Sequence, residues 1–267
     1  MMIPANLIIE NHMAVSLLLE GRENDSLRLI KAALCSLRAF VESESKRELQ
    51  FGSGEVSSIG DLQTAIVPLK SLSPSDIHGG VFRIFNRAFT IQSPEVLKGH
   101  VFLDQYKMGA ILLYNAGLCY HLKGVHSGLS QDFAVARDFY RNAFSLVIET
   151  SAIARISNHD ALLVLSLTNN MGHLNSSLFD LSAARVCLDM MQRLFSSIEE
   201  RIMNDEDALF FFLTTMLVTF DHLCASPAAW SSPKCMQKLV LHSDGHNQQK
   251  SIARLNVVGC CVHASTS

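Results

Sequence analysis

The chain has 267 residues, of which 48% are hydrophobic, 18% charged and 7% aromatic. This length is enough for one large domain or two small ones with a sizeable core, and the composition excludes a chain that is disordered throughout. The 22 basic and 25 acidic residues leave a formal net charge of -3. No excess of cations is therefore available to bind nucleic acid or acidic lipid, and neither is an expected partner.

The N-terminus lacks the basic start and continuous apolar stretch of a signal peptide, because Glu10 and His12 interrupt its apolar pattern. The longest apolar-rich run, residues 208–220, is shorter than the roughly 20 residues that span a membrane and predicts a buried helix. The seven cysteines are widely scattered, as reduced cysteines in an intracellular core are. We expect an intracellular protein without a membrane span, in the cytoplasm, with the nucleus as the alternative.

The first 80 residues predict a pair of helices followed by a linker. Apolar residues recur at helical spacing through residues 1–45, and Gly21 separates the two helices. Asn24 or Asp25 is the predicted cap of the second helix. Residues 46–80 are polar and rich in turn residues, which predicts a loop-rich linker. Within it, residues 61–72 indicate a short helix.

Residues 81–92 are compatible with two conformations. Four apolar positions fit one face of a helix, whereas Val81, Arg83 and Phe85 fit one face of a strand. We favour the helix, with the strand as the alternative.

The rest of the chain predicts a helical domain over residues 81–227 that is continuous with the N-terminal pair. Beyond residue 227 the periodicity is weak, and residues 228–267 predict a poorly ordered tail. The expected helices cover residues 101–120, 133–150, 160–177, 181–201 and 204–224.

A pattern of small residues recurs three times along the chain, with anchors at Ala14, Gly117 and Gly172. Small residues allow two helices to approach closely where they cross. We therefore expect Gly117 to pack against Ala136 and Gly172 against Ala184. In the middle copy, residues 125–131 are a predicted loop insertion. Large residues are expected beside these crossings, in the pairs Tyr120 with Tyr140 and Phe179 with Leu188.

These offsets resemble the tetratricopeptide (TPR) repeat, and residues 113–122 (LYNAGLCYHL) and 169–174 (NNMGHL) resemble the multi-copy TPR-like proteins of diatoms. No proline closes the repeats, and the anchors are spaced more widely than the TPR period. The resemblance implies an all-α fold, in which antiparallel helix pairs stack as an irregular right-handed superhelix. It brings no assigned activity.

The resemblance also implies a ligand groove. Asn115 and Asn170 both lie two residues before an anchor glycine, on the face where an asparagine of a TPR domain can hold the backbone of a bound peptide. The first copy has His12 at this place, and Tyr114 is a further groove candidate. A grip on the acidic C-termini of chaperones is not expected, because the neighbouring groove positions are not basic; they are Tyr114, Leu118, Ser166 and Asn11.

Catalytic and metal-binding signatures are weak in this sequence. It contains no CxxC pair and no other convergent set of four metal ligands, so no metal or cofactor is expected. We expect a non-enzymatic scaffold that binds a protein or peptide in its groove. The alternative is a small-molecule binder or degenerate hydrolase that uses His121, His159 or His173 in a pocket between helix pairs.

Overall fold

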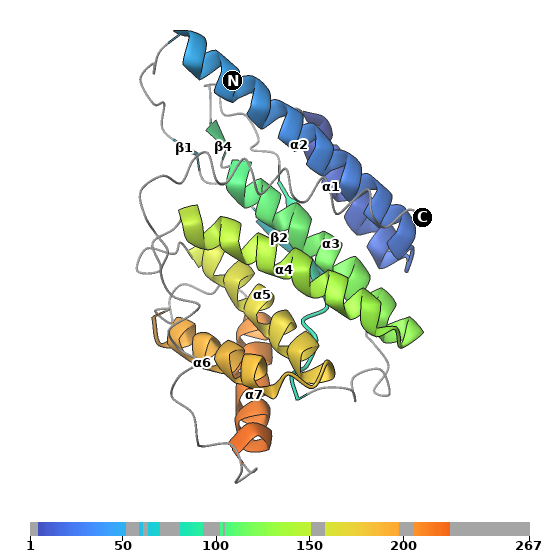
Figure 1. Cartoon of the computed structure of the whole chain (residues 1–267), viewed down its shortest axis with the longest axis vertical. Coiled ribbons are helices and arrows are strands. Elements are labelled where there is room, and N and C mark those ends of the chain that lie inside the picture. Colours follow the sequence, from blue (N-terminus) through green and yellow to red (C-terminus); the bar gives the residue numbers. More distant parts are fainter. Residues whose placement is uncertain are drawn as a thin grey trace.

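The computed structural model describes residues 5–51, 59–60, 64–69, 81–92, 102–103, 105–150, 158–197 and 206–224. Helices dominate this part of the chain (Figure 1), which confirms the expected helical class. The predicted tail, residues 228–267, lies outside the described residues. None of the described helices is long and apolar enough to cross a membrane.

Seven helices and four short strands make up the described part of the chain. The helices are α1 Ala5–Leu19, α2 Glu23–Phe51, α3 Gln105–Ser127, α4 Ser130–Thr150, α5 Asn158–Ser177, α6 Leu181–Ser197 and α7 Glu206–Cys224. The strands are β1 Ile59–Gly60, β2 Thr64–Pro68, β3 Arg87–Ile91 and β4 Phe102–Leu103.

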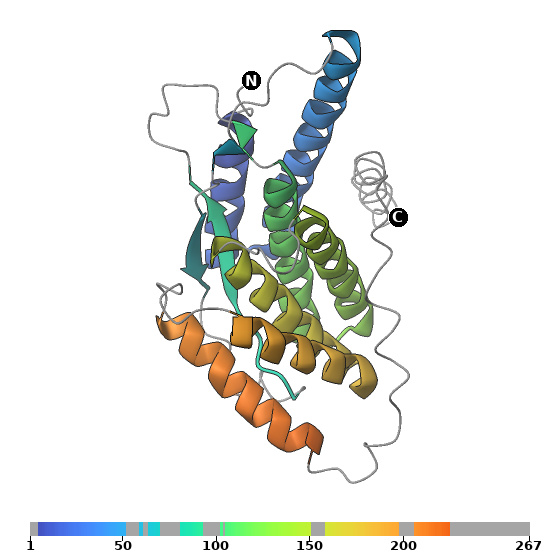
Figure 2. The same ribbon diagram turned by 90° about the vertical axis from the view of Figure 1, so that its left-hand side faces the viewer.

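The helices form three hairpins, α1 with α2, α3 with α4 and α5 with α6, that stack in chain order. Helix α2 packs on α3, α4 packs on α5, and α7 packs on α6. The small residues Ala14, Ala136 and Ala184 are fully buried, as positions at close helix contacts are. This order leaves α1, α3 and α5, the first helices of the hairpins, to face one side of the stack (Figure 2).

Each hairpin turns at a residue in the left-handed backbone region: Gly21 (φ 74°), Gly128 (φ 70°) and Phe179 (φ 62°). In the first turn, Gly21 N–H donates to Leu18 O and Arg22 N–H to Leu17 O. The third turn has the same bonds, from Phe179 to Ser176 and from Asp180 to Asn175. This pairing caps the last carbonyls of a helix, and glycine favours it because it has no Cβ.

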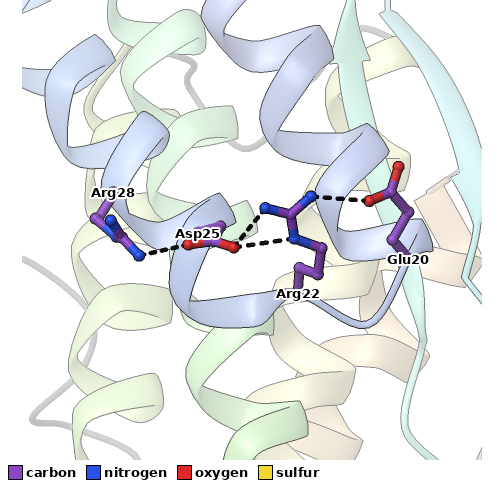
Figure 3. Close-up of polar contacts among 4 residues, drawn as sticks. All are labelled: Glu20, Arg22, Asp25 and Arg28. Carbon is purple, nitrogen blue, oxygen red and sulfur yellow. Dashed lines mark hydrogen bonds and ion pairs between the residues drawn. The ribbon is translucent and has the colours of Figure 1, made fainter.

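Exposed charges surround the first of these turns. Figure 3 shows Arg22 between Glu20 and Asp25, with Arg28 on the other side of Asp25. Helix α2 begins at Glu23, so neither Asn24 nor Asp25 is its cap, and that prediction is wrong. Asp25 instead lies in the first turn, where the helix dipole favours a negative charge.

Residues 81–92 are not helical, which corrects our expectation. Strand β3 pairs antiparallel with β2, so that Ile66 lies opposite Phe89. The short helix expected within residues 61–72 is likewise replaced, over 64–68, by β2. The apolar pattern was misleading because β3 is covered on both faces, and residues Ala88 to Ile91 are all buried. A strand buried on both faces loses the alternation that identifies it.

The insertion in the second hairpin is mostly helical. Residues 125–131 were expected to form a loop, but α3 continues to Ser127 and α4 begins at Ser130. The extra residues therefore lengthen both helices of this hairpin. Gly124 lies seven residues after its anchor, as the turn residue Gly21 does. It nevertheless lies inside α3, where a methyl group would come within 2.5 Å of the Phe133 ring.

Candidate functional site

An extended stretch of the chain, residues 81–92, lies along α1, α3 and α5 on the side of the stack where those helices face. We call it the central segment. Its Val81 end lies at α5 and α7, and its Ile91 end lies at α1 (Figure 2). The face that the sequence predicts as a ligand groove is therefore filled by the chain's own backbone.

Two asparagines hold this backbone in the same way. Asn115 Oδ1 accepts from Phe89 N–H at 3.1 Å, and its Nδ2 donates to Phe89 O at 2.8 Å. Asn170 does the same for Phe85, at 2.9 Å and 3.2 Å. A side-chain amide offers one acceptor and paired donors, so each asparagine satisfies a whole residue as a neighbouring strand would.

Helix α1 makes the equivalent contact with two residues. Asn11 Oδ1 accepts from Ile91 N–H at 3.0 Å, and His12 Nε2 lies 2.8 Å from Ile91 O. Because a carbonyl oxygen only accepts, His12 is the donor, in the tautomer with a proton on Nε2. The sequence placed Asn11 in the groove but did not predict that it contacts a ligand. Its position could have indicated this contact, because Asn11 lies three residues before its anchor, as Tyr114 and Asn169 do.

Tyr114 and Asn169 extend the contact between these points. The Tyr114 hydroxyl lies 3.0 Å from Arg87 O and 3.2 Å from Phe85 O, and Asn169 Nδ2 donates to Arg83 O at 2.8 Å. Burial raises the pKa of Tyr114, so its hydroxyl keeps its proton and can donate to a carbonyl. The central segment is thus bound on one edge by β2 and on the other by helix side chains.

The side chains of the central segment fill apolar sites between the helices. Phe82, Phe85 and Phe89 are all at least 99% buried. Phe85 stacks on Phe212 of α7 with ring centroids 4.8 Å apart, and Phe89 meets Tyr114 edge to face at 5.0 Å. Side-chain amides hydrogen-bond to the backbone of the central segment, and apolar sites between the helices enclose its aromatic rings.

The two anchor glycines each lie close to an aromatic ring. At Gly117 the atoms nearest to an added methyl belong to the Tyr140 ring, at 2.7 Å. At Gly172 they belong to the Phe82 ring, at 2.6 Å, so this glycine makes room for the central segment. The sequence could not show this, because Phe82 lies in a segment whose conformation it did not identify.

One large residue expected beside a crossing, Phe179, is exposed instead. Tyr120 stacks on Phe139, with ring centroids 5.6 Å apart. Phe179 is 91% exposed at the turn after α5, so it does not fill a groove beside Leu188. Phe179 instead occupies the turn of its hairpin, as Gly21 does in the first hairpin.

Two of the three histidines considered for a catalytic pocket meet behind the groove. His121 Nε2 lies 2.9 Å from His173 Nδ1, and His121 Nδ1 lies 3.3 Å from the Tyr140 hydroxyl. Burial lowers the pKa of His173 to about 4 and lowers that of His121 as well, so both are neutral at pH 7. His173 Nε2 is buried without a hydrogen-bond partner. His159 lies in the first turn of α5.

This arrangement is a packed polar cluster. The hydrogen-bonding partners of His121 are His173 and Tyr140, and neither is the carboxylate that orients a catalytic histidine. Asn170 Nδ2 also lies 3.3 Å from the Tyr140 hydroxyl, so the cluster supports the asparagine that holds Phe85. Among the described residues, no group of three or more His, Cys, Asp or Glu side chains could hold a metal ion.

No protein-family model, no curated protein and no solved structure matches the chain.

Proposed function

We propose that this chain is a non-enzymatic interaction scaffold with a TPR-like arrangement of helix hairpins. Its groove, along α1, α3 and α5, binds an extended segment of a partner protein through the backbone. The central segment occupies the groove as a built-in ligand, and the partner strand takes its place. The observation that carries this proposal is the pair of two-point contacts from Asn115 to Phe89 and from Asn170 to Phe85.

Recognition of this kind suits a polypeptide ligand. Every residue except proline offers one N–H and one C=O, so a groove that reads these groups binds any extended chain. Selectivity then comes from the apolar sites, here filled by Phe82, Phe85 and Phe89. A strand with large apolar residues at the same spacing would fit the same groove.

A peptide-exchange experiment tests the proposal on the full-length protein. Phe85→Ala removes a ring that stacks on Phe212. It should therefore weaken the binding of the central segment in the groove, and it leaves every groove asparagine unaltered. A fluorescent peptide with the sequence of residues 81–92 is added, and its binding is followed by fluorescence anisotropy. We expect the variant to bind the peptide at least about tenfold more tightly than the unaltered chain.

Two controls separate backbone recognition from general apolar binding. A peptide N-methylated at Phe85 and Phe89 keeps every side chain but lacks the two N–H donors, and it should bind at least about tenfold more weakly. Adding Asn115→Ala to the Phe85→Ala chain should have a similar effect. Equal affinity for the methylated and unmethylated peptides would show that the asparagines do not select the ligand. Absence of binding to a Phe85→Ala chain that is folded by circular dichroism would refute the exchange.

A further inference from the structure

Helix α7 has an apolar stripe on the face that points away from the hairpins. Its buried face includes Ala208 and Phe212, and Phe212 stacks on the central segment. The opposite face carries four large apolar residues that are exposed: Phe210 (72%), Leu213 (42%), Leu217 (73%) and Phe220 (50%). We call these four residues the α7 stripe. An exposed apolar stripe of this size on a surface helix is typical of a protein contact.

The α7 stripe repeats at the spacing that two packed helices use. Its residues are separated by three, four and three positions, which is the spacing of core positions in paired helices. Both the spacing and the order Phe, Leu, Leu, Phe are the same in either direction along the helix. Two copies of α7 that run antiparallel about a twofold axis would thus place each Phe210 against Phe220 of the other copy, and each Leu213 against Leu217.

The helix dipoles favour the antiparallel orientation. Glu206 and Asp207 lie in the first turn of α7, whereas the last turn carries Asp221 and His222. A parallel pair would bring the two acidic first turns together, where they repel. An antiparallel pair separates these turns and opposes the two helix dipoles.

We propose that a second copy of this chain covers the α7 stripe, in a symmetric homodimer with antiparallel α7 helices. A twofold axis requires one surface to complement itself, and the reversible order of the stripe meets this requirement. The contact lies on the opposite face of α7 from Phe85, so dimer formation leaves the groove asparagines in place. The proposal does not depend on peptide binding.

Sedimentation of the full-length protein over a range of concentrations tests the dimer. Leu217→Glu places two buried carboxylates in the symmetric contact and should weaken dimerisation at least about 30-fold. Because Leu217 is 73% exposed in the single chain, its helix content should not change. Met13→Glu is the matched control: Met13 is also exposed, at 53%, but lies on α1, and this substitution should leave dimerisation unchanged.

A cysteine pair tests the orientation. Chains with Leu213→Cys and chains with Leu217→Cys are oxidised separately and as a mixture, and cross-linked peptides are identified by mass spectrometry. The antiparallel contact predicts a link between residues 213 and 217 in the mixture alone. Links from 217 to 217 within one preparation would overturn it. A chain that stays monomeric at about 100 μM, or dimerises equally well with Leu217→Glu, would overturn the homodimer.

Discussion

Phe179 occupies a backbone position that glycine fills in the other two hairpins. Its φ of 62° is left-handed, and its side chain is 91% exposed, so the ring contributes little packing while the backbone is strained. The strain for a residue with a Cβ is roughly 1 kcal/mol. We expect Phe179→Gly to stabilise the fold by about that amount and to raise Tm by about 2–4 °C, measured by thermal unfolding.

Phe179→Ala separates the two causes. Alanine removes the ring but retains the Cβ, so it should leave Tm close to that of the unaltered chain. A gain equal to that of the glycine variant would assign the effect to the exposed ring and not to the backbone.

Gly172 is the second residue with a sharp expectation. A methyl group there would lie 2.6 Å from the Phe82 ring, which is fully buried. Gly172→Ala should therefore cost about 1–3 kcal/mol, although alanine is the better helix former. Unfolding with a denaturant measures this loss. In a chain that already carries Phe82→Leu, the smaller side chain leaves room for the methyl group, so Gly172→Ala should destabilise that chain less than it destabilises the unaltered chain. Additive losses of stability in the double variant would show that the two residues do not touch.

One edge of strand β3 pairs with β2, and helix side chains hold its other edge, where a central strand of a sheet would have a second neighbouring strand. Asn115→Leu keeps a similar volume but leaves Phe89 N–H and Phe89 O buried without partners. This should cost about 2–6 kcal/mol, since each of the two unpaired polar groups costs about 1–3 kcal/mol. Asn24 is exposed on α2, and Asn24→Leu should change the free energy of unfolding by less than about 0.5 kcal/mol. Chemical denaturation of both variants makes the comparison, and similar losses would show that Asn115 does not hold the strand.

The histidine cluster makes the stability of the whole molecule depend on pH. The pKa of His173 is about 4 in the folded chain, against 6.5 for the ordinary side chain. Between these values the unfolded chain binds a proton that the folded chain does not, so the free energy of unfolding falls as pH falls from 6.5 to 4. The full loss from this residue is about 3 kcal/mol.

Denaturation at a series of pH values measures this slope. His173→Gln should flatten it, because glutamine does not titrate. An unaltered slope in the His173 variant would mean that other groups cause the acid sensitivity.

At the scale of the whole molecule, the sequence by itself determined the helical class and much of the helix order. Helical periodicity is a local property, and short turns oblige consecutive helices to pair. It also identified Asn115 and Asn170, because both lie at the same offset from a glycine. It did not predict their contacts with Phe89 and Phe85, because these residues belong to the central segment, and Phe85 lies 85 residues before Asn170 in the sequence.

Only the tertiary structure decided what fills the groove. Residues 81–92 have apolar side chains on both faces of the strand, so their pattern does not distinguish a strand from a helix. The outcome was set by partners that are distant in the chain: β2 on one edge, and Asn11, Asn115 and Asn170 on the other. An extended backbone is stable in a buried place only where all its N–H and C=O groups are satisfied, and these partners come together only when the three hairpins stack.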